Sequence, residues 1–183
     1  MNSSAKSNMF SVARETVLAT FANHLYTASL PGESIPKGEA ADTLLFCVVA
    51  QVRLGAEAIK ALSNSAAALG YGQNACFFIA LESNGETLAP KQLFSLIEGI
   101  DPLALVAADS AAMRALEQAY RIAQDVIFKG KENSSAKRFS LAPNMFTRIL
   151  GRNAVTFSSF ESMLSTPNDK QRAWALLKKL PRM

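Results

Sequence analysis

The sequence predicts an α/β domain, a three-layer sandwich in which helices flank a small, mostly parallel sheet of roughly three to five strands. Two apolar runs, Ala75–Leu81 and Leu103–Ala108, carry this prediction. Neither run alternates with polar residues, which is typical of strands covered on both faces. A helix signal at Pro90 separates the two runs, and the amphipathic segment Ala111–Gln124 follows the second. Strands joined through a helix imply parallel pairing and a right-handed crossover.

One long Ala-rich helix is expected to pack against this sheet. Apolar residues recur every three to four positions from Leu44 to Leu69, a spacing that a strand does not maintain. The segment Ala41–Leu69 therefore reads as one helix, bent at Gly55 and closed by Gly70.

The rest of the chain divides into a tail and one domain. Residues 1–9 are expected to form a disordered tail, and residues 10–183 a single α/β domain. The remaining expected elements are a helix at Ser11–Tyr26, a loop at Gly32–Glu39, short strands at Val126–Phe128 and Arg138–Leu141, a brief helix at Pro143–Leu150, a strand at Asn153–Phe157, and a last helix capped by Asn168 or Asp169.

Composition narrows the class of protein. With 49% hydrophobic and 19% charged residues, the chain resembles an ordinary soluble protein. The longest apolar run, Leu44–Ala50, falls short of the roughly 20 residues that span a bilayer, so no membrane partner is expected. Met1–Met9 is polar, which favours a cytoplasmic location. Two cysteines and one histidine argue against a Cys/His zinc site, and neither metal nor cofactor is expected.

Charge is distributed unevenly along the chain. From Lys129 to the end there are eleven Lys/Arg residues against three acids, whereas the first 128 residues hold eight bases and twelve acids. A basic C-terminal third favours an anionic partner, either nucleic acid or an acidic protein. The alternative is a solvated basic face together with a flexible basic loop. The candidate binding residues are Lys129, Lys131, Lys137, Arg138, Arg148 and Arg152.

The β-α-β-α unit resembles the uracil-DNA glycosylase-like superfamily fold. The resemblance lies in the segment from Ile100 to Leu116, Ile-Asp-Pro-Leu-Ala-Leu-Val-Ala-Ala-Asp-Ser-Ala-Ala-Met-Arg-Ala-Leu, and in a late strand followed by a Trp-containing helix. It covers about Asn74–Lys179. Enzymes of that family carry a Gly-acidic-x-Pro-type segment after the first strand and a His-Pro-Ser-type segment after the last. Here Glu82-Ser-Asn-Gly-Glu and Ser158-Ser-Phe-Glu stand in those places. The resemblance therefore implies the fold without the usual glycosylase chemistry.

Polar residues follow the predicted strands. Ligands of open α/β sheets bind beyond the carboxyl ends of the strands, where Glu82 and Asp109 are expected to face each other near Ser158, Ser159 and Glu161. Two such carboxylates suit acid/base catalysis or a divalent cation. The alternative is that Glu82 is a solvated loop residue and Asp109 a helix N-cap. His24 is expected at a surface or boundary position near a helix C-terminus.

These features favour a non-catalytic domain that binds nucleic acid or another anionic partner through its basic C-terminal third. A small-molecule enzyme that uses Glu82 and Asp109 is the alternative, and a structural or oligomeric protein without a ligand is a third reading. The oligomeric state stays open.

Overall fold

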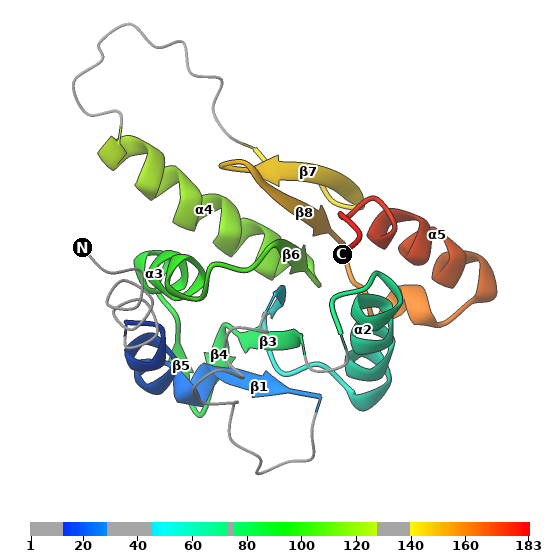
Figure 1. The fold of residues 1–183 in the computed structure, drawn as a ribbon, viewed down its shortest axis with the longest axis horizontal. Coiled ribbons are helices and arrows are strands. Elements are labelled where there is room, and N and C mark those ends of the chain that lie inside the picture. The colour runs from blue at the N-terminus through cyan, green and yellow to red at the C-terminus, as the bar shows by residue number, and fades with distance from the viewer. Residues whose placement is uncertain (1–12, 29–44, 73–74, 128–139) are drawn as a thin grey trace, which may run out of the picture.

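The computed structural model describes residues 13–28, 45–72, 75–127 and 140–183. It shows an α/β fold with a mostly parallel sheet, as the sequence predicts (Figure 1). The expected tail at residues 1–9 and the expected loop Gly32–Glu39 lie outside the described residues.

The elements follow one another as short strands and longer helices. The strands of the main sheet are β1 (Leu25–Thr27), β2 (Phe46–Ala50), β3 (Cys76–Ala80), β6 (Ala104–Ala107), β7 (Met145–Ile149) and β8 (Arg152–Thr156), and a separate hairpin consists of β4 (Glu82–Ser83) and β5 (Glu86–Thr87). The helices are residues 13–20, the 3₁₀ turn η1 (Ala22–His24), α2 (Ala56–Ala68), α3 (Pro90–Ile100), α4 (Ser110–Ile127), the 3₁₀ turn η3 (Ser162–Leu164) and α5 (Pro167–Leu177).

The main sheet has six strands among the described residues, more than the three to five expected. Their order is β1-β3-β2-β6-β8-β7. The four central strands are parallel, whereas β1 pairs antiparallel with β3 and β7 pairs antiparallel with β8. Three of these strands were not expected: β1 and β7 at the edges of the sheet, where a strand pairs with only one neighbour, and β2 at its centre.

The predicted long helix Ala41–Leu69 is wrong in its first half. Phe46–Ala50 forms β2, which lies between β3 and β6 with every residue buried, and only Ala56–Ala68 is helical. Gly55 begins this helix as its N-cap instead of bending a longer one. A continuously apolar run satisfies helical and strand spacing equally well, so the two neighbouring strands decide its conformation.

Three smaller predictions also differ from the structure. The first helix stops before Leu25–Thr27, which pairs with β3 as an edge strand. Val126 belongs to α4, so no strand begins there. The predicted helix Pro143–Leu150 is β7, the first half of a hairpin. Its turn residues Leu150 and Gly151 have φ values of 46° and 88°, the left-handed geometry that closes two-residue hairpins.

Apolar side chains form two clusters, one on each face of the sheet. Along β2 and β3, Cys47 and Phe77 belong to one cluster, and their neighbours Phe46 and Phe78 belong to the other. Residues of α3 and α4 pack in the first cluster, and residues of α2 and α5 in the second. The chain runs from β2 to β3 in one direction and from β3 to β6 in the other, so right-handed crossovers place α2 and α3 on opposite faces.

Gly99 permits the close approach of α3 to the first helix. A Cβ atom at this position would lie 2.7 Å from Cγ2 of Val17, well inside contact distance. No helix in the described parts of the chain is long and apolar enough to cross a bilayer.

Candidate functional site

The chain changes direction at the carboxyl ends of β2 and β6. These two strands are neighbours, but the connections that leave them go to opposite sides of the sheet. Doubly wound folds bind ligands at such a point. Gln51 follows β2 and Asp109 follows β6, so both residues lie at this edge.

Both carboxylate oxygens of Asp109 accept hydrogen bonds from backbone N–H groups. Oδ1 lies 2.8 Å from the nitrogen of Ala112 and caps α4, as the sequence predicts. Oδ2 lies 2.8 Å from the nitrogen of Gln51, at the end of the neighbouring strand. Asp109 therefore joins the start of a helix to the loop after β2.

Glu82 lies on the other side of Gln51. The side-chain amide of Gln51 donates to Oε1 of Glu82 over 3.0 Å, while its backbone donates to Asp109. Glu82 is exposed and Asp109 is half-buried. The two predicted carboxylates, Glu82 and Asp109, therefore both accept hydrogen bonds from Gln51. Sequence reasoning missed Gln51 because it fell inside the predicted long helix.

The polar residues that follow β8 are also bound within the fold. The carbonyl oxygen of Ser158 accepts hydrogen bonds from the backbone and hydroxyl of Ser110, each at 3.1 Å. Oε1 of Glu161 accepts one from the nitrogen of Gly55 at 2.7 Å, just before α2. Carboxylates at this edge therefore hold loops and helix starts in place.

His24 is buried, contrary to the surface or boundary position expected for it. Its Nδ1 lies 2.8 Å from the carbonyl oxygen of Ala80, the last residue of β3, and must donate because a carbonyl only accepts. Its Nε2 lies 4.0 Å from Oε2 of Glu86 in β5. The pairing of β1 with β3 brings this histidine to the strand ends, which the sequence pattern did not reveal.

The six predicted basic residues differ in their surroundings. Lys129, Lys131, Lys137 and Arg138 lie outside the described residues. Arg148 is exposed on the edge strand β7. Arg152, at the start of β8, has a side chain that is only 12% exposed.

Arg152 is held by partners from two helices and the turn after one of them. Its guanidinium lies 2.6 Å from Oε1 of Glu98, 2.6 Å from Oδ1 of Asp101 and 2.8 Å from the hydroxyl of Tyr120. Burial disfavours its charge, but the hydrogen bond to Glu98, the nearby Tyr120 and the hydrogen bond to Asp101 together raise the pKa of Arg152. Burial raises the pKa of Tyr120, and this effect outweighs the positive charge of Arg152, which lowers it.

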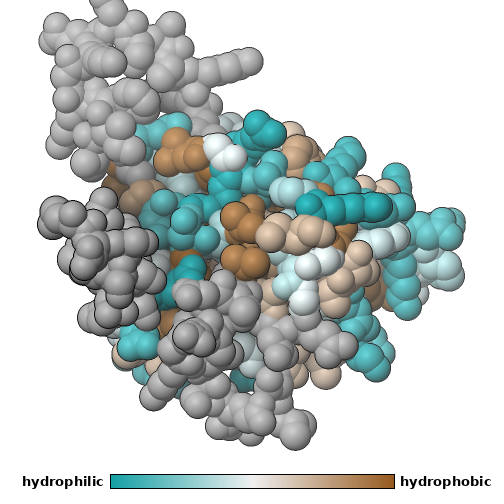
Figure 2. Space-filling model, in the orientation of Figure 1, coloured by the Kyte–Doolittle hydropathy of each residue, from teal (hydrophilic) through white to brown (hydrophobic). Residues whose placement is uncertain are grey.

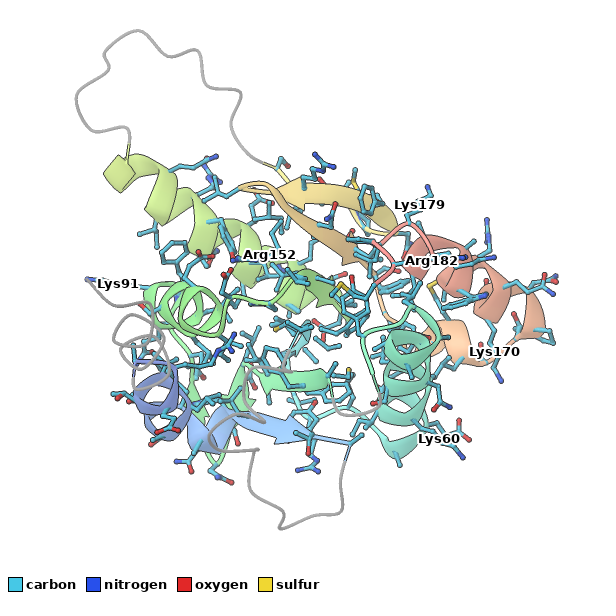
Figure 3. All side chains as sticks on the ribbon, in the orientation of Figure 1. Lys60, Lys91, Arg152, Lys170, Lys179 and Arg182 are labelled. Carbon is cyan, nitrogen blue, oxygen red and sulfur yellow. The ribbon has the colours of Figure 1, made fainter. Side chains whose placement is uncertain are left out.

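Other cations of the C-terminal third are exposed on α5 and on the residues after it. Lys170, Lys178, Lys179 and Arg182 have no ion pair within the described residues, and Arg172 pairs with Asp169 at 3.7 Å. Figure 3 shows Lys60, Lys170, Lys179 and Arg182 around α2 and α5, whereas Lys91 lies at the opposite end of the view. Hydrophilic residues predominate on the surface over α5 (Figure 2).

The described residues contain no group of three or more His, Cys, Asp or Glu side chains that would hold a metal ion. Cys47 and Cys76 are free and buried in neighbouring strands, and they belong to opposite faces of the sheet. Burial raises the pKa of Cys76 to about 12 and also raises that of Cys47, so both thiols stay protonated and poorly nucleophilic at neutral pH.

In comparisons with known proteins, no family model matches this chain, and no curated protein matches its sequence significantly.

Proposed function

We propose that this protein is a non-catalytic α/β domain that binds nucleic acid or another anionic partner through its basic C-terminal third. One observation carries the proposal. The cations Lys170, Lys178, Lys179 and Arg182 are exposed and have no acidic partner in the described parts of the chain. Charges that the fold does not use internally are available to a ligand, and an unbalanced basic surface attracts polyanions.

The acidic residues support the same proposal by contrast. Asp109 and Glu161 accept hydrogen bonds from backbone groups that would otherwise lack an acceptor. A carboxylate committed to a helix cap and a loop is poorly placed to exchange protons with a substrate. The strand ends therefore favour a structural role for these acids over a catalytic one.

Binding tests the proposal directly. We expect the full-length protein to shift DNA or RNA in a gel at about 50 mM salt and to lose this binding steeply as salt increases. Polyglutamate, tested in parallel by competition, separates an acidic-protein partner from a nucleic-acid partner. The variants R148E and K129E/K131E report on the predicted residues outside α5. Binding of neither polyanion at low salt would overturn the proposal.

An enzyme acting on a small molecule is the second candidate. It is favoured by the meeting of Glu82 and Asp109 at Gln51, at the edge where doubly wound sheets bind ligands. Screening small molecules for a rise in melting temperature tests it. A stabilising compound whose effect is lost in E82Q but kept in K91Q would support this candidate, and equal effects in both variants would oppose it.

Three further proposals concern the class of protein. We propose a three-layer sandwich, supported by helix residues in the clusters on both faces of the sheet. The resemblance to the uracil-DNA glycosylase-like fold is supported by the parallel sheet, a feature shared with other doubly wound proteins. A cytoplasmic location is supported by the two free cysteines.

A further inference from the structure

A basic groove lies between α2 and α5. It is an open hollow of about 300 Å³. Its lining residues are Glu57, Lys60, Ala61 and Asn64 from α2, Leu164 from η3, and Lys170 from α5. Lys60 and Lys170 therefore stand on facing walls of the groove, which come from segments more than a hundred residues apart in the chain.

The groove offers hydrogen-bond donors from both walls. Lys60 and Lys170 are exposed and form no ion pair within the described residues, although Glu57 lies nearby in the lining. The amide of Asn64 adds a neutral donor one helical turn after Lys60. Two ammonium groups and an amide around one hollow suit the oxygens of a phosphodiester, which accept several hydrogen bonds at once.

The cations continue beyond the groove along α5. Lys170, Trp174 and Lys178 are four residues apart and so share one stripe of the helix. Trp174 packs against the apolar cluster that α2 and α5 share and is partly exposed, and the ammonium of Lys178 lies over its ring, 5.7 Å from the centre. From Lys170 to Lys178 the stripe is about 12 Å long, the rise of a few nucleotides.

The C-terminal residues extend the same surface. The backbone of Met183 donates to the carbonyl oxygen of Leu69 at 3.0 Å, and the hydroxyl of Tyr71 donates to that of Pro181 at 2.9 Å. These contacts hold the C-terminal residues against the end of α2. Figure 3 shows Lys60, Lys170, Lys179 and Arg182 around α2 and α5, and together with Lys178 we call these cations the basic strip.

We propose that this strip binds single-stranded nucleic acid, with phosphates between Lys60 and Lys170 and along Lys178. This inference rests on the proposed function and specifies its site and partner. A base can stack on a partly exposed aromatic ring while the lysines on either side pair with its flanking phosphates. A peptide that offers carboxylates alone would pair with the lysines but would not stack on the ring. A hollow of about 300 Å³ has room for a phosphodiester group and its sugar, which a flexible single strand can place there.

A matched pair of double variants tests the inference. K60E/K170E reverses both groove charges. K91E/R114E makes the same change in net charge at exposed positions of α3 and α4, which pack on the opposite face of the sheet. Binding to a fluorescein-labelled oligothymidylate of about 16 nucleotides is followed by fluorescence anisotropy over a range of salt concentrations.

We expect K60E/K170E to weaken binding at least about tenfold and to reduce the magnitude of the slope of log K against log salt by about one to two, because two phosphate contacts are lost. K91E/R114E should change affinity by less than about threefold, and K60R/K170R should keep wild-type affinity. Equal melting temperatures for wild type and K60E/K170E would show that the fold is intact, since both positions are exposed.

Two outcomes would overturn the inference and leave the proposed function standing. In one, K60E/K170E and K91E/R114E bind the oligonucleotide equally well while wild-type binding still falls with salt. In the other, wild type binds polyglutamate but no oligonucleotide. If wild type binds neither polyanion at low salt, the proposed function fails together with the inference.

Discussion

Arg152 and Lys170 belong to the same basic C-terminal third, yet the fold uses them in opposite ways. Arg152 is almost buried and contacts Glu98, Asp101 and Tyr120. Lys170 is exposed, in a groove where its facing residue is a second lysine. A count of charges treats the two residues alike. The comparison shows that a basic segment holds both cations that stabilise the fold and cations that are free to meet a partner.

The largest expected effect is on the Arg152 side of this comparison. R152A removes the shared partner of Glu98, Asp101 and Tyr120, and we expect the free energy of unfolding to fall by about 2–3 kcal/mol. The value is reduced for solvent screening because the side chain of Asp101 is 78% exposed. Urea unfolding measures it. R152K keeps the positive charge but lacks the planar guanidinium, so its free energy of unfolding should lie between those of wild type and R152A. If R152A lost no more free energy of unfolding than K170A, Arg152 and Lys170 would not differ in their contribution to stability.

The acids at the strand ends extend the comparison to the opposite charge. D109A removes both the cap of α4 and the acceptor for Gln51, so we expect a loss of about 1–2 kcal/mol in the free energy of unfolding. E82A removes only an exposed acceptor and should cost less than about 0.5 kcal/mol. Thermal unfolding of both variants tests this order. Equal losses would show that the two carboxylates are used alike.

The turn before Arg152 offers a stabilising change. Leu150 occupies a left-handed position that asparagine fills in the matching Asn84-Gly85 turn, where φ is 52°. L150N should raise the free energy of unfolding by about 1 kcal/mol, because asparagine tolerates this conformation better than leucine does. The reciprocal variant N84L should lower it. Chemical unfolding measures both, and anion binding by L150N should match wild type. A destabilised L150N would contradict the turn geometry.

The smallest expected effect on stability comes from the free cations. K170Q/K179Q should change the free energy of unfolding by less than about 0.5 kcal/mol, since neither lysine has an ion pair within the described residues. The same variant should weaken binding of the oligonucleotide. A large loss of stability with unchanged binding would reverse the roles assigned to the two groups of cations.

The sequence predicted three of the four parallel strands and two residues of the candidate site, Glu82 and Asp109. The strand cores at Cys76–Ala80 and Ala104–Ala107 and the helices α3 and α4 follow from local patterns. The cap at Asp109 follows from its place before a helix, and its position at the same edge of the sheet as Glu82 follows from parallel strands that end there. Gln51 and His24 could not be placed, because each reaches the strand ends through pairing with a strand distant in the chain.

What the sequence determined by itself was therefore local: which runs are apolar on all sides, where helices begin, and how many cations the C-terminal third contains. Tertiary structure decided the rest. Phe46–Ala50 is a central strand because β3 and β6 supply its hydrogen bonds. Met145–Ile149 is an edge strand because a tight turn connects it to β8, with which it pairs. Tertiary structure also determined which cations form ion pairs. Whether a basic residue is bound or free depends on which acids lie beside it in space, and the order of residues along the chain does not contain that information.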